Sequence, residues 1–384
     1  MSAGGCKRHN GTVTMRDLVR QPLRSVAAYD PGPTLADLKQ RYGLKEIVKL
    51  NWNEDLFGLL PGVREAIIEE ISRSELYPEQ AYSDFRQLVA GRAGGDPSML
   101  VPAHGIQSLI FSAVAVFVNP GDRVVLPQPT YGLYRQACEA AGARVDRVPT
   151  RGYRLDLEAM LSASAGAKLV FICDPNNPTG DALSPGEWRG FIERLPSGCV
   201  AVVDEAYADY MEPTTRPGRI DEVRAGRPVV LLRTFSKLFG LAGLRLGYAV
   251  VHPDLVPAFD AVQEPFNVNR LALAAGRACL ADPGRIEARR REVVAARDTF
   301  ANELRQLGIE SWPSQANFLL ANVGGDDARW SEALLRRGYL VRPGSEYGLA
   351  GHLRITIGPQ PLMRAVAQVM AEVAEELKRP TGVG

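Results

Sequence analysis

The sequence predicts an α/β fold: a large domain with a mostly parallel central sheet covered by helices, plus a smaller α+β domain. From about residue 98, short β-branched runs alternate with longer amphipathic runs, which is typical of a sheet covered by helices. After about residue 265, long helical stretches mix with strand-like runs. Because the chain has 384 residues and one core seldom exceeds roughly 250–300 residues, we expect two domains.

Five strands are expected in the large domain, each a short run rich in β-branched or aromatic residues: DRVVLP (122–127), KLVFICDP (168–175), CVAVVDEAY (199–207), PVVLLRTF (228–235) and LGYAVV (246–251). Helices are expected over 131–142 and 184–195, where apolar residues recur at three- and four-residue intervals. The second helix should begin after Ser184 as N-cap, with Pro185 at its first position.

The smaller domain should contain a long helix over 285–308 and strands over 316–323, 339–344 and 352–358. We therefore expect an N-terminal tail and arm over 1–48, packing on the small domain, a large domain over 49–265 and a small domain over 266–384. The first dozen residues are small, polar and unpatterned, which is typical of a mobile tail.

Composition narrows the function classes. The formal net charge is +1, with acids and bases interspersed, so nucleic acid and membrane surfaces are not expected partners. The expected partner is a small molecule. The five cysteines form no CxxC pair, which argues against a zinc knuckle or a disulfide framework and favours buried thiols. With no apolar leader segment and no membrane-length apolar run, a soluble, cytoplasmic protein is expected.

Polar residues gather at the ends of three expected strands: Asp174, Asn176 and Asn177; Asp204 and Tyr207; Thr234, Ser236 and Lys237. In an open α/β sheet the ligand lies beyond the carboxyl ends of parallel strands, so these clusters could form one site. The alternative is that loops are simply polar, and any one cluster alone favours that interpretation.

Lys237 stands in the apolar, glycine-punctuated segment TFSKLFGLAGLRLGY (234–248), in a chain that otherwise uses arginine for positive charge. Lysine, unlike arginine, can lose its proton and attack a carbonyl to form a Schiff base. The alternative is that Lys237 caps a strand and extends to water.

Other chemistries lack support in the sequence. The four histidines, His9, His104, His252 and His352, are not spaced as a metal pair, so no metal site is expected. GLAGLRLG is not a G-x-G-x-x-G fingerprint, and no phosphate-binding G-x-x-x-x-G-K-[ST] loop occurs. Its glycines are expected to let the chain turn and pass close to a bulky neighbour.

Pyridoxal 5'-phosphate (PLP) is the aldehyde cofactor whose requirements the strand ends can meet. Asp204 would hold the protonated pyridine nitrogen, and Asn177 and Tyr207 would donate to the phenolic oxygen. Tyr131 would stack on the ring. The phosphate would be bound by Thr234, Ser236 and Arg245.

Four motifs together resemble the fold-type I PLP-dependent aminotransferases, and most closely the histidinol-phosphate aminotransferase group: DPNNPTG (174–180), VVDEAYADY (202–210), TFSKLFGLAGLRLGY (234–248) and HLRITIG (352–358). The resemblance runs from about Tyr29 to the C-terminal helix. It implies that Lys237 is the Schiff-base lysine, that Asp204 and Tyr207 are catalytic, and that 49–265 is the PLP-binding domain. It also implies that Arg354 binds the anionic group of the substrate.

Further matches favour the histidinol-phosphate group. AYDPG (28–32) and YLVRPG (339–344) resemble segments that bind the substrate phosphate, which implies this role for Tyr29 and Arg342, and Asn53 in NWNEDLFG matches a substrate-binding position. LYPEQAY resembles a segment whose tyrosine reaches the cofactor of a neighbouring subunit. Tyr77 therefore implies a homodimer with shared active sites.

The chain departs from the family pattern at two places. In PAHGIQSL, Ala103 and His104 replace an acidic pair before the helix that receives the cofactor phosphate, but backbone N–H groups at a helix start can still hold phosphate. In NWNEDLFG, Trp52 and Asp55 are expected to alter a segment near the substrate entrance.

The expected reaction is transfer of an amino group between L-histidinol phosphate, or a related amine, and 2-oxoglutarate, with glutamate as product. The alternative is a PLP-dependent decarboxylase of a phosphorylated amino acid, or a specialised aminotransferase of secondary metabolism, on the same fold. A ligand-sensing regulator would need a DNA-binding domain, for which the N-terminal stretch is short and lacks a helix-turn-helix pattern.

Overall fold

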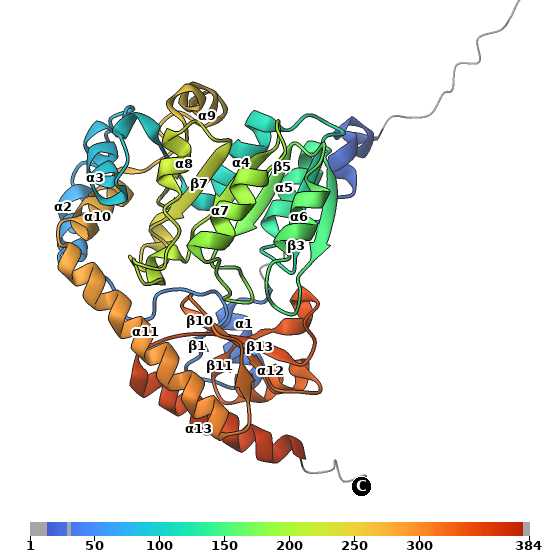
Figure 1. Ribbon diagram of the computed structural model, residues 1–384. Coiled ribbons are helices and arrows are strands. Elements are labelled where there is room, and N and C mark those ends of the chain that lie inside the picture. Colours follow the sequence, from blue (N-terminus) through green and yellow to red (C-terminus); the bar gives the residue numbers. More distant parts are fainter. Residues whose placement is uncertain (1–13, 29–31, 379–384) are drawn as a thin grey trace, which may run out of the picture.

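The computed structural model describes residues 14–28 and 32–378, and its elements form two domains (Figure 1). The upper domain contains a seven-stranded sheet and the lower one a four-stranded sheet. The expected tail and Tyr29 lie outside the described residues. The domain limits expected at 48/49 and 265/266 stay predictions.

The large sheet has the strand order β2-β8-β7-β6-β5-β3-β4, in which only β8 runs antiparallel to the others. Its strands are β2 (Leu100–Ala103), β3 (Arg123–Gln128), β4 (Arg144–Pro149), β5 (Leu169–Cys173), β6 (Val200–Asp204), β7 (Val229–Thr234) and β8 (Gly247–Val250). The five expected strands are confirmed as β3 and β5 to β8. Sequence analysis missed the two edge strands, because β2 contains Pro102 and β4 is rich in charged residues.

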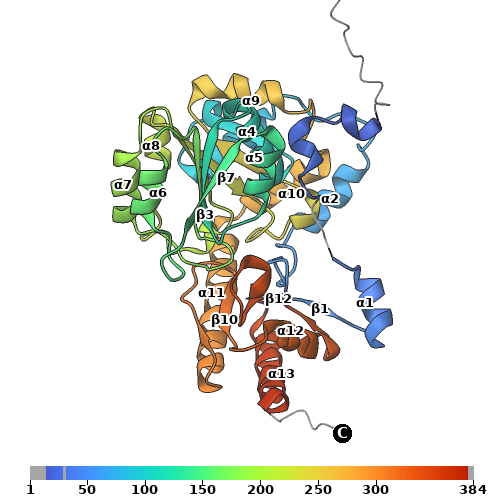
Figure 2. The same cartoon turned by 90° about the vertical axis from the view of Figure 1, so that its right-hand side faces the viewer.

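Helices cover both faces of this sheet (Figure 2). One face carries α6 (Leu157–Ala163), α7 (Pro185–Arg194) and α8 (Ile220–Arg224), and the other carries α4 (Gly105–Phe117), α5 (Leu133–Ala141) and α9 (Val256–Val262). The buried strand β5 shows why two covers are needed. Its Val170 and Ile172 pack in one hydrophobic core with Trp188, whereas Phe171 packs in the other with Tyr134.

The expected helix after Ser184 is confirmed as α7. The Ser184 hydroxyl accepts a hydrogen bond from the Glu187 backbone N–H at 3.2 Å, and the Glu187 carboxylate accepts one from the Ser184 N–H at 2.8 Å. This reciprocal capping box and Pro185 at the first helical position define the helix start.

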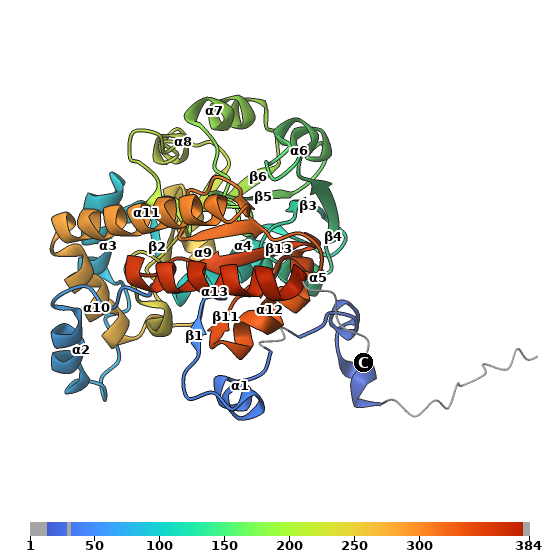
Figure 3. The ribbon, with the colours of Figure 1, turned by 90° about the horizontal axis from the view of Figure 1, so that it is seen from below.

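The small domain has an antiparallel sheet of order β12-β13-β10-β9. The strands are β9 (Glu310–Ser311), β10 (Phe318–Asn322), β12 (Arg342–Pro343) and β13 (His352–Thr356). Helices α11 (Pro283–Gln306) and α13 (Gln360–Lys378) lie side by side across it (Figure 3), and α12 (Asp327–Arg336) completes the cover. The expected long helix over 285–308 is confirmed as α11.

The segment before the large domain packs on the small one. After α1 (Leu35–Tyr42), β1 (Val48–Lys49) pairs in parallel with β11 (Tyr339–Leu340). Helices α2 (Val63–Ile71) and α3 (Ser83–Ala93) pack against α10 (Arg270–Leu280) at the side of the large sheet. The chain therefore passes from the small domain to the large one just before the residues that contact Lys237.

The cysteines and the helix lengths can be compared with expectation in the described part of the chain. Cys138, Cys173, Cys199 and Cys279 are buried free thiols, as expected, while Cys6 lies outside the described residues. Within residues 14–28 and 32–378, no helix combines the length and the apolar character needed to cross a bilayer.

Candidate active site

The carboxyl ends of β5, β6 and β7 meet at the edge of the large sheet that faces the small domain (Figure 1). Asp204, the last residue of β6, pairs with Cys173 of β5 on one side and with Leu232 of β7 on the other. The loops that follow these strands carry Asn177, Tyr207 and Lys237. Parallel pairing therefore brings the expected clusters to one edge.

Lys237 is held inside this edge by backbone carbonyls. Its Nζ donates to the Trp52 carbonyl at 3.1 Å and to the Asn53 carbonyl at 2.9 Å. Burial, helped by the positive charge of Arg354, lowers the pKa of Lys237 to about 7. The alternative in which this ammonium extends to water does not match these contacts, and near neutral pH much of the amine is unprotonated.

Asp204 is a buried carboxylate with few donors. Its Oδ2 accepts from the Tyr134 hydroxyl at 2.6 Å and its Oδ1 from the Ala206 backbone N–H at 3.0 Å. Burial raises the pKa of Asp204 to about 6, opposed by these donors and by the charge of Lys237. A carboxylate in this state is well suited to a cationic partner, because a nearby positive charge favours its ionised form.

Tyr207 and Asn53 lie between the two domains. The Tyr207 hydroxyl accepts from Asn53 Nδ2 at 3.0 Å, and the Tyr207 ring centroid is 5.4 Å from Lys237 Nζ. Burial raises the pKa of Tyr207, so it stays a phenol that can donate its proton. Asn53 has a φ of 54°, which asparagine tolerates, and its N–H donates to the Thr356 hydroxyl at 3.0 Å.

Two arginines lie opposite each other on neighbouring strands of the small sheet, because Arg342 of β12 pairs with Arg354 of β13. Arg354 is buried and donates to Asn177 Oδ1 at 2.6 Å, to the Tyr347 hydroxyl at 2.7 Å and to the Asn51 carbonyl. Arg342 forms an ion pair with Glu346 at 2.6 Å. The small domain thus presents two guanidinium groups beside the Tyr347 ring, and one of them, Arg354, contacts Asn177.

A third cation lies at the start of α4. Arg245 donates to Gln107 Oε1 at 3.0 Å, and Gln107 Nε2 donates to the Tyr131 hydroxyl at 2.9 Å. A Cβ at Gly105, where φ is 75°, would lie 2.9 Å from Arg245 Nη2, so this close approach requires glycine. His104, which is exposed, and the buried Ala103 directly precede this glycine.

The hydroxyls expected beside this cation belong to Thr234, the last residue of β7, and to Ser236 on the loop that follows. The Ser236 N–H donates to Thr234 Oγ1 at 3.0 Å, and both residues are buried. Arg245, these hydroxyls and the N–H groups at the start of a 13-residue helix form a set of donors typical of a phosphate site. The set around Lys237 therefore fits PLP: an amine, a carboxylate, phenolic and amide donors, and a phosphate cradle.

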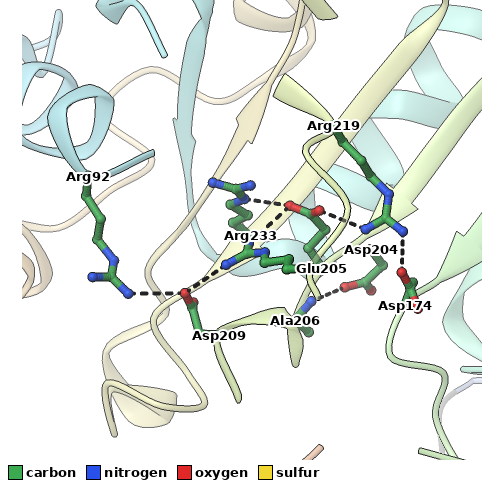
Figure 4. A network of polar contacts seen from close by, with 9 residues as sticks. Arg92, Asp174, Asp204, Glu205, Ala206, Asp209, Arg219 and Arg233 are labelled. Carbon is green, nitrogen blue, oxygen red and sulfur yellow. Dashed lines mark hydrogen bonds and ion pairs between the residues drawn. The ribbon is translucent and has the colours of Figure 1, made fainter. Parts of the chain in front are cut away.

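Some expected residues lie elsewhere. Tyr77 is 79% exposed, and its ring stacks on Phe266 with centroids 4.8 Å apart. Asp174 does not join the site, because it forms a buried ion pair with Arg219 (Figure 4). Asn176 is also structural, since its Nδ2 donates to the Pro129 carbonyl at 3.1 Å.

The expectation for Asp55 was wrong. Its side chain is 1% exposed and accepts from Arg289 of α11 at 3.0 Å, so it does not face a substrate entrance. Trp52, in contrast, is 41% exposed, and its ring lies 3.9 Å from the Lys49 ammonium. Only one of the two departures in NWNEDLFG therefore changes an exposed surface.

Sequence analysis missed three residues that contact the expected set: Tyr134, Gln107 and Tyr347. Tyr134 lies on a helix expected only as cover for the sheet, Gln107 on the helix expected to receive the cofactor phosphate, and Tyr347 in a short turn between β12 and β13. The spacing of Tyr131 and Tyr134 by one helical turn was the only available signal that both could face the strand ends.

The comparisons with known proteins agree with this geometry. The model of the family "Aminotransferase class I and II" matches residues 45–370. A histidinol-phosphate aminotransferase of Symbiobacterium thermophilum is 37% identical over 359 residues, which are 93% of this chain and 99% of the relative.

Solved structures show the same likeness. The histidinol-phosphate aminotransferase of Sinorhizobium meliloti in complex with pyridoxal-5'-phosphate superposes with a TM-score of 0.87 and 27% identity, over 94% of this chain and 98% of the other. An L-threonine-O-3-phosphate decarboxylase of Porphyromonas gingivalis gives a TM-score of 0.76 and 25% identity, over 86% and 99%. With its site residues, its family match and these relatives, the chain belongs to the class I and II aminotransferases.

Proposed function

We propose that this PLP-dependent aminotransferase moves an amino group between L-histidinol phosphate and 2-oxoglutarate. The observation that carries the reaction type is the Lys237 amine, whose pKa of about 7 lets it accept and return a proton near neutral pH. The assignment of the substrate rests on the relatives named histidinol-phosphate aminotransferase and on the paired arginines of β12 and β13.

When bound, PLP supplies an aldehyde for the lysine and an electron sink for the substrate α-carbon. Asp204 would keep the pyridine nitrogen protonated, since pairing with a cation stabilises this buried carboxylate. Tyr207 and Asn177 would donate to the phenolic oxygen. Arg354 already occupies Oδ1 of Asn177, so the Nδ2 donor at the other end of this amide is directed away from Arg354.

The remaining cofactor contacts follow from the same set of residues. Tyr131 would cover the ring. The phosphate would be held by the start of α4 after Ala103 and His104, and by Thr234, Ser236 and Arg245. Once Lys237 is released from the cofactor, its amine would carry a proton between the substrate α-carbon and the cofactor. Asn53 would hold this amine in place through its carbonyl.

For the substrate, a bidentate guanidinium suits both a carboxylate and a phosphate. Arg354 would bind the anionic group closest to the reacting carbon, and Arg342, with Tyr29, the more distant phosphate. Arg342 is paired with the Glu346 carboxylate, so an incoming phosphate would have to displace this carboxylate. An anion with two charges competes for Arg342 better than one with a single charge.

We also propose a homodimer with shared active sites and a cytoplasmic location. Tyr77 supports the dimer, because a largely exposed tyrosine stacked on the partly exposed Phe266 is available to a second copy of the chain. In that arrangement its hydroxyl would reach the partner's cofactor.

Absorbance spectroscopy of the purified holoenzyme tests the proposal. Adding L-histidinol phosphate without an oxo acid should remove the visible cofactor band and produce the near-ultraviolet band of the aminated cofactor, and 2-oxoglutarate should reverse the change. A protein that ignores histidinol phosphate but responds to glutamate would contradict the substrate and keep the reaction type. A protein that cannot be loaded with cofactor would contradict both.

A second candidate is decarboxylation of a phosphorylated amino acid, favoured by the likeness to the L-threonine-O-3-phosphate decarboxylase. The same two arginines would then bind a carboxylate and a phosphate. Release of carbon dioxide from such a substrate, without consumption of an oxo acid, would identify this reaction. A specialised aminotransferase would instead consume the oxo acid with a different amine.

A further inference from the structure

A cavity of about 550 Å³ lies where the large domain meets the first turns of α11, and no residue assigned to the active site lines it. Its walls hold six arginines: Arg92, Arg216, Arg219, Arg224, Arg233 and Arg290. Only three acidic residues line it with them, namely Asp209, Asp221 and Glu287. The charge of the cavity depends on how completely carboxylates pair with these guanidinium groups.

The inner end of the cavity holds two compensated arginines (Figure 4). Arg233 donates to Glu205 at 2.6 Å, and Arg219 donates to Glu205 at 2.9 Å and to Asp174. The side chains of Glu205, Asp174 and Arg219 are at most 1% exposed. Two buried carboxylates thus neutralise two guanidiniums.

The next layer outward is one carboxylate short. Arg92 and Arg216 share Asp209, at 3.2 and 3.4 Å, and the only other ion pair of Arg216 among the described residues reaches Glu205 at 3.5 Å. Glu205 already has its two closer partners. Four guanidiniums therefore face three carboxylates, in a place where these outer side chains are only 18–32% exposed and a surplus charge is poorly screened.

The outer rim adds cations from both sides. Arg224 comes from α8 and Arg290 from α11. Their carboxylate partners, Asp221, Glu287 and Glu212, have side chains 42–81% exposed, so water and salt weaken the negative charge there. The rim carries three carboxylates for two guanidiniums, but because these carboxylates are exposed they compensate only part of the charge of Arg92 and Arg216 further in.

We propose that this arginine cavity is a second binding site, separate from the active site, for a small phosphate or phosphate monoester. A dianion would supply the missing negative charge between Arg92 and Arg216, and guanidinium forks match phosphate oxygens. Because Arg290 belongs to α11 and the other arginines to the large domain, the bound anion ties this helix to the sheet. Glu205, at the inner end, directly follows the active-site Asp204, so the ion-pair cluster behind the cavity is joined to the cofactor contacts through the chain.

Calorimetric titration of the cofactor-saturated enzyme with inorganic phosphate, and separately with glycerol 3-phosphate, tests this site. Each titration is repeated with chloride at the same ionic strength, as a control for nonspecific anion binding. The proposal predicts that binding survives in Arg342→Gln/Arg354→Gln, which disables the substrate arginines. It predicts a loss of at least about tenfold in affinity in Arg92→Gln/Arg216→Gln. Tighter binding of glycerol 3-phosphate would identify an ester as the natural ligand, and equal binding would identify free phosphate.

Arg291→Gln is the matched control, since Arg291 lies on α11 with its side chain 69% exposed and does not line the cavity. The control should bind phosphate like the unmodified enzyme. If Arg92→Gln/Arg216→Gln does not fold, Arg216→Lys keeps the charge, loses the fork and should weaken binding severalfold. Loss of binding in Arg342→Gln/Arg354→Gln with full binding in the cavity variants, or no binding beyond the effect of chloride, would overturn the proposal.

Discussion

Asp204 and Glu205 are consecutive in the chain, both are buried, and their pKa values move in opposite directions. Burial raises the pKa of Asp204 to about 6, because only a hydroxyl, an amide and a nearby lysine oppose it. For Glu205 the charges of Arg233, Arg216 and Arg219 outweigh burial and hold the pKa well below its usual range. The strand directs one carboxylate to each side of the sheet edge.

The difference separates reactivity from structural support. The active-site side leaves Asp204 and Lys237 near the pH at which they change charge, which is useful for proton transfer and costs stability. The Glu205 side holds the ends of β6 and β7 through ion pairs of Glu205, whose pKa stays well below its usual range. Substitutions on the two sides should therefore affect different measurements.

The largest effect should come from Lys237→Ala, which removes the amine that is proposed to carry the proton. Turnover in a coupled glutamate assay is expected to fall by several orders of magnitude. Lys168→Ala, at the far end of β5, is the matched control and should remain active. A Lys237→Ala enzyme with near-full turnover would contradict the assignment.

Asp204→Asn should come next. It keeps the shape of the side chain but removes the negative charge that is proposed to face the pyridine nitrogen, so kcat should fall by about 10²–10⁴-fold. Unfolding in urea should change little, because the buried charge that costs stability is also removed. Unchanged kcat, or a large loss of stability, would indicate that Asp204 has a structural role like that of Glu205.

Glu205→Gln should show the reverse pattern. It leaves Arg233, Arg216 and Arg219 facing one carboxylate fewer, and breaking a buried ion pair in this way typically costs about 3–5 kcal/mol of unfolding free energy. The exposed substitution Arg291→Gln should stay within about 0.5 kcal/mol of the unmodified protein. If urea unfolding showed equal stability for both variants, the ion pairs around Glu205 would not support the strand ends as described.

The pH dependence of cofactor loading tests the state of Lys237. Because its pKa is lowered from 10.5 to about 7, the reactive neutral amine should appear as pH rises through about 7. The rate of cofactor incorporation into the apoprotein should therefore rise with a midpoint near pH 7. In Arg354→Gln, where a neighbouring positive charge is lost, the midpoint should move to higher pH; a midpoint near 10 in the unmodified protein would refute the shift.

Tyr134→Phe should give the smallest effect. Removing this hydroxyl takes away a donor that stabilises the Asp204 carboxylate, so the pKa of Asp204 should rise further. The acidic limb of the pH profile of kcat should move to higher pH, with a loss of only a fewfold at neutral pH. Tyr131→Phe keeps the donor to Asp204 and should leave that limb in place.

The sequence predicted those parts of the fold that local patterns determine. The apolar runs of β5 and β7 and the capping signal at Ser184 each have a physical cause within a few residues. β4 was missed because an edge strand with Arg144, Asp146 and Arg147 lacks the apolar pattern of a buried one. The pairing of β1 with β11 joins residues nearly 300 positions apart, and no local pattern encodes it.

For the site, residue chemistry and motif order identified Lys237, Asp204 and Arg354, which the fold then brings to one edge. The partners that adjust them were not predictable, because they come from distant elements. Tyr134 reaches Asp204 across 70 positions, and Asp55, expected near the substrate, pairs with Arg289 across 234.

The central claim is that Lys237, and no other lysine, bonds to the cofactor. Sodium borohydride reduction of the holoenzyme, followed by proteolysis and mass spectrometry, tests it directly, because reduction makes the lysine–cofactor bond permanent. We expect the cofactor mass to remain on the peptide containing Lys237, and Lys237→Ala to retain none. A modified peptide from another lysine, such as Lys49 beside Trp52, would contradict it.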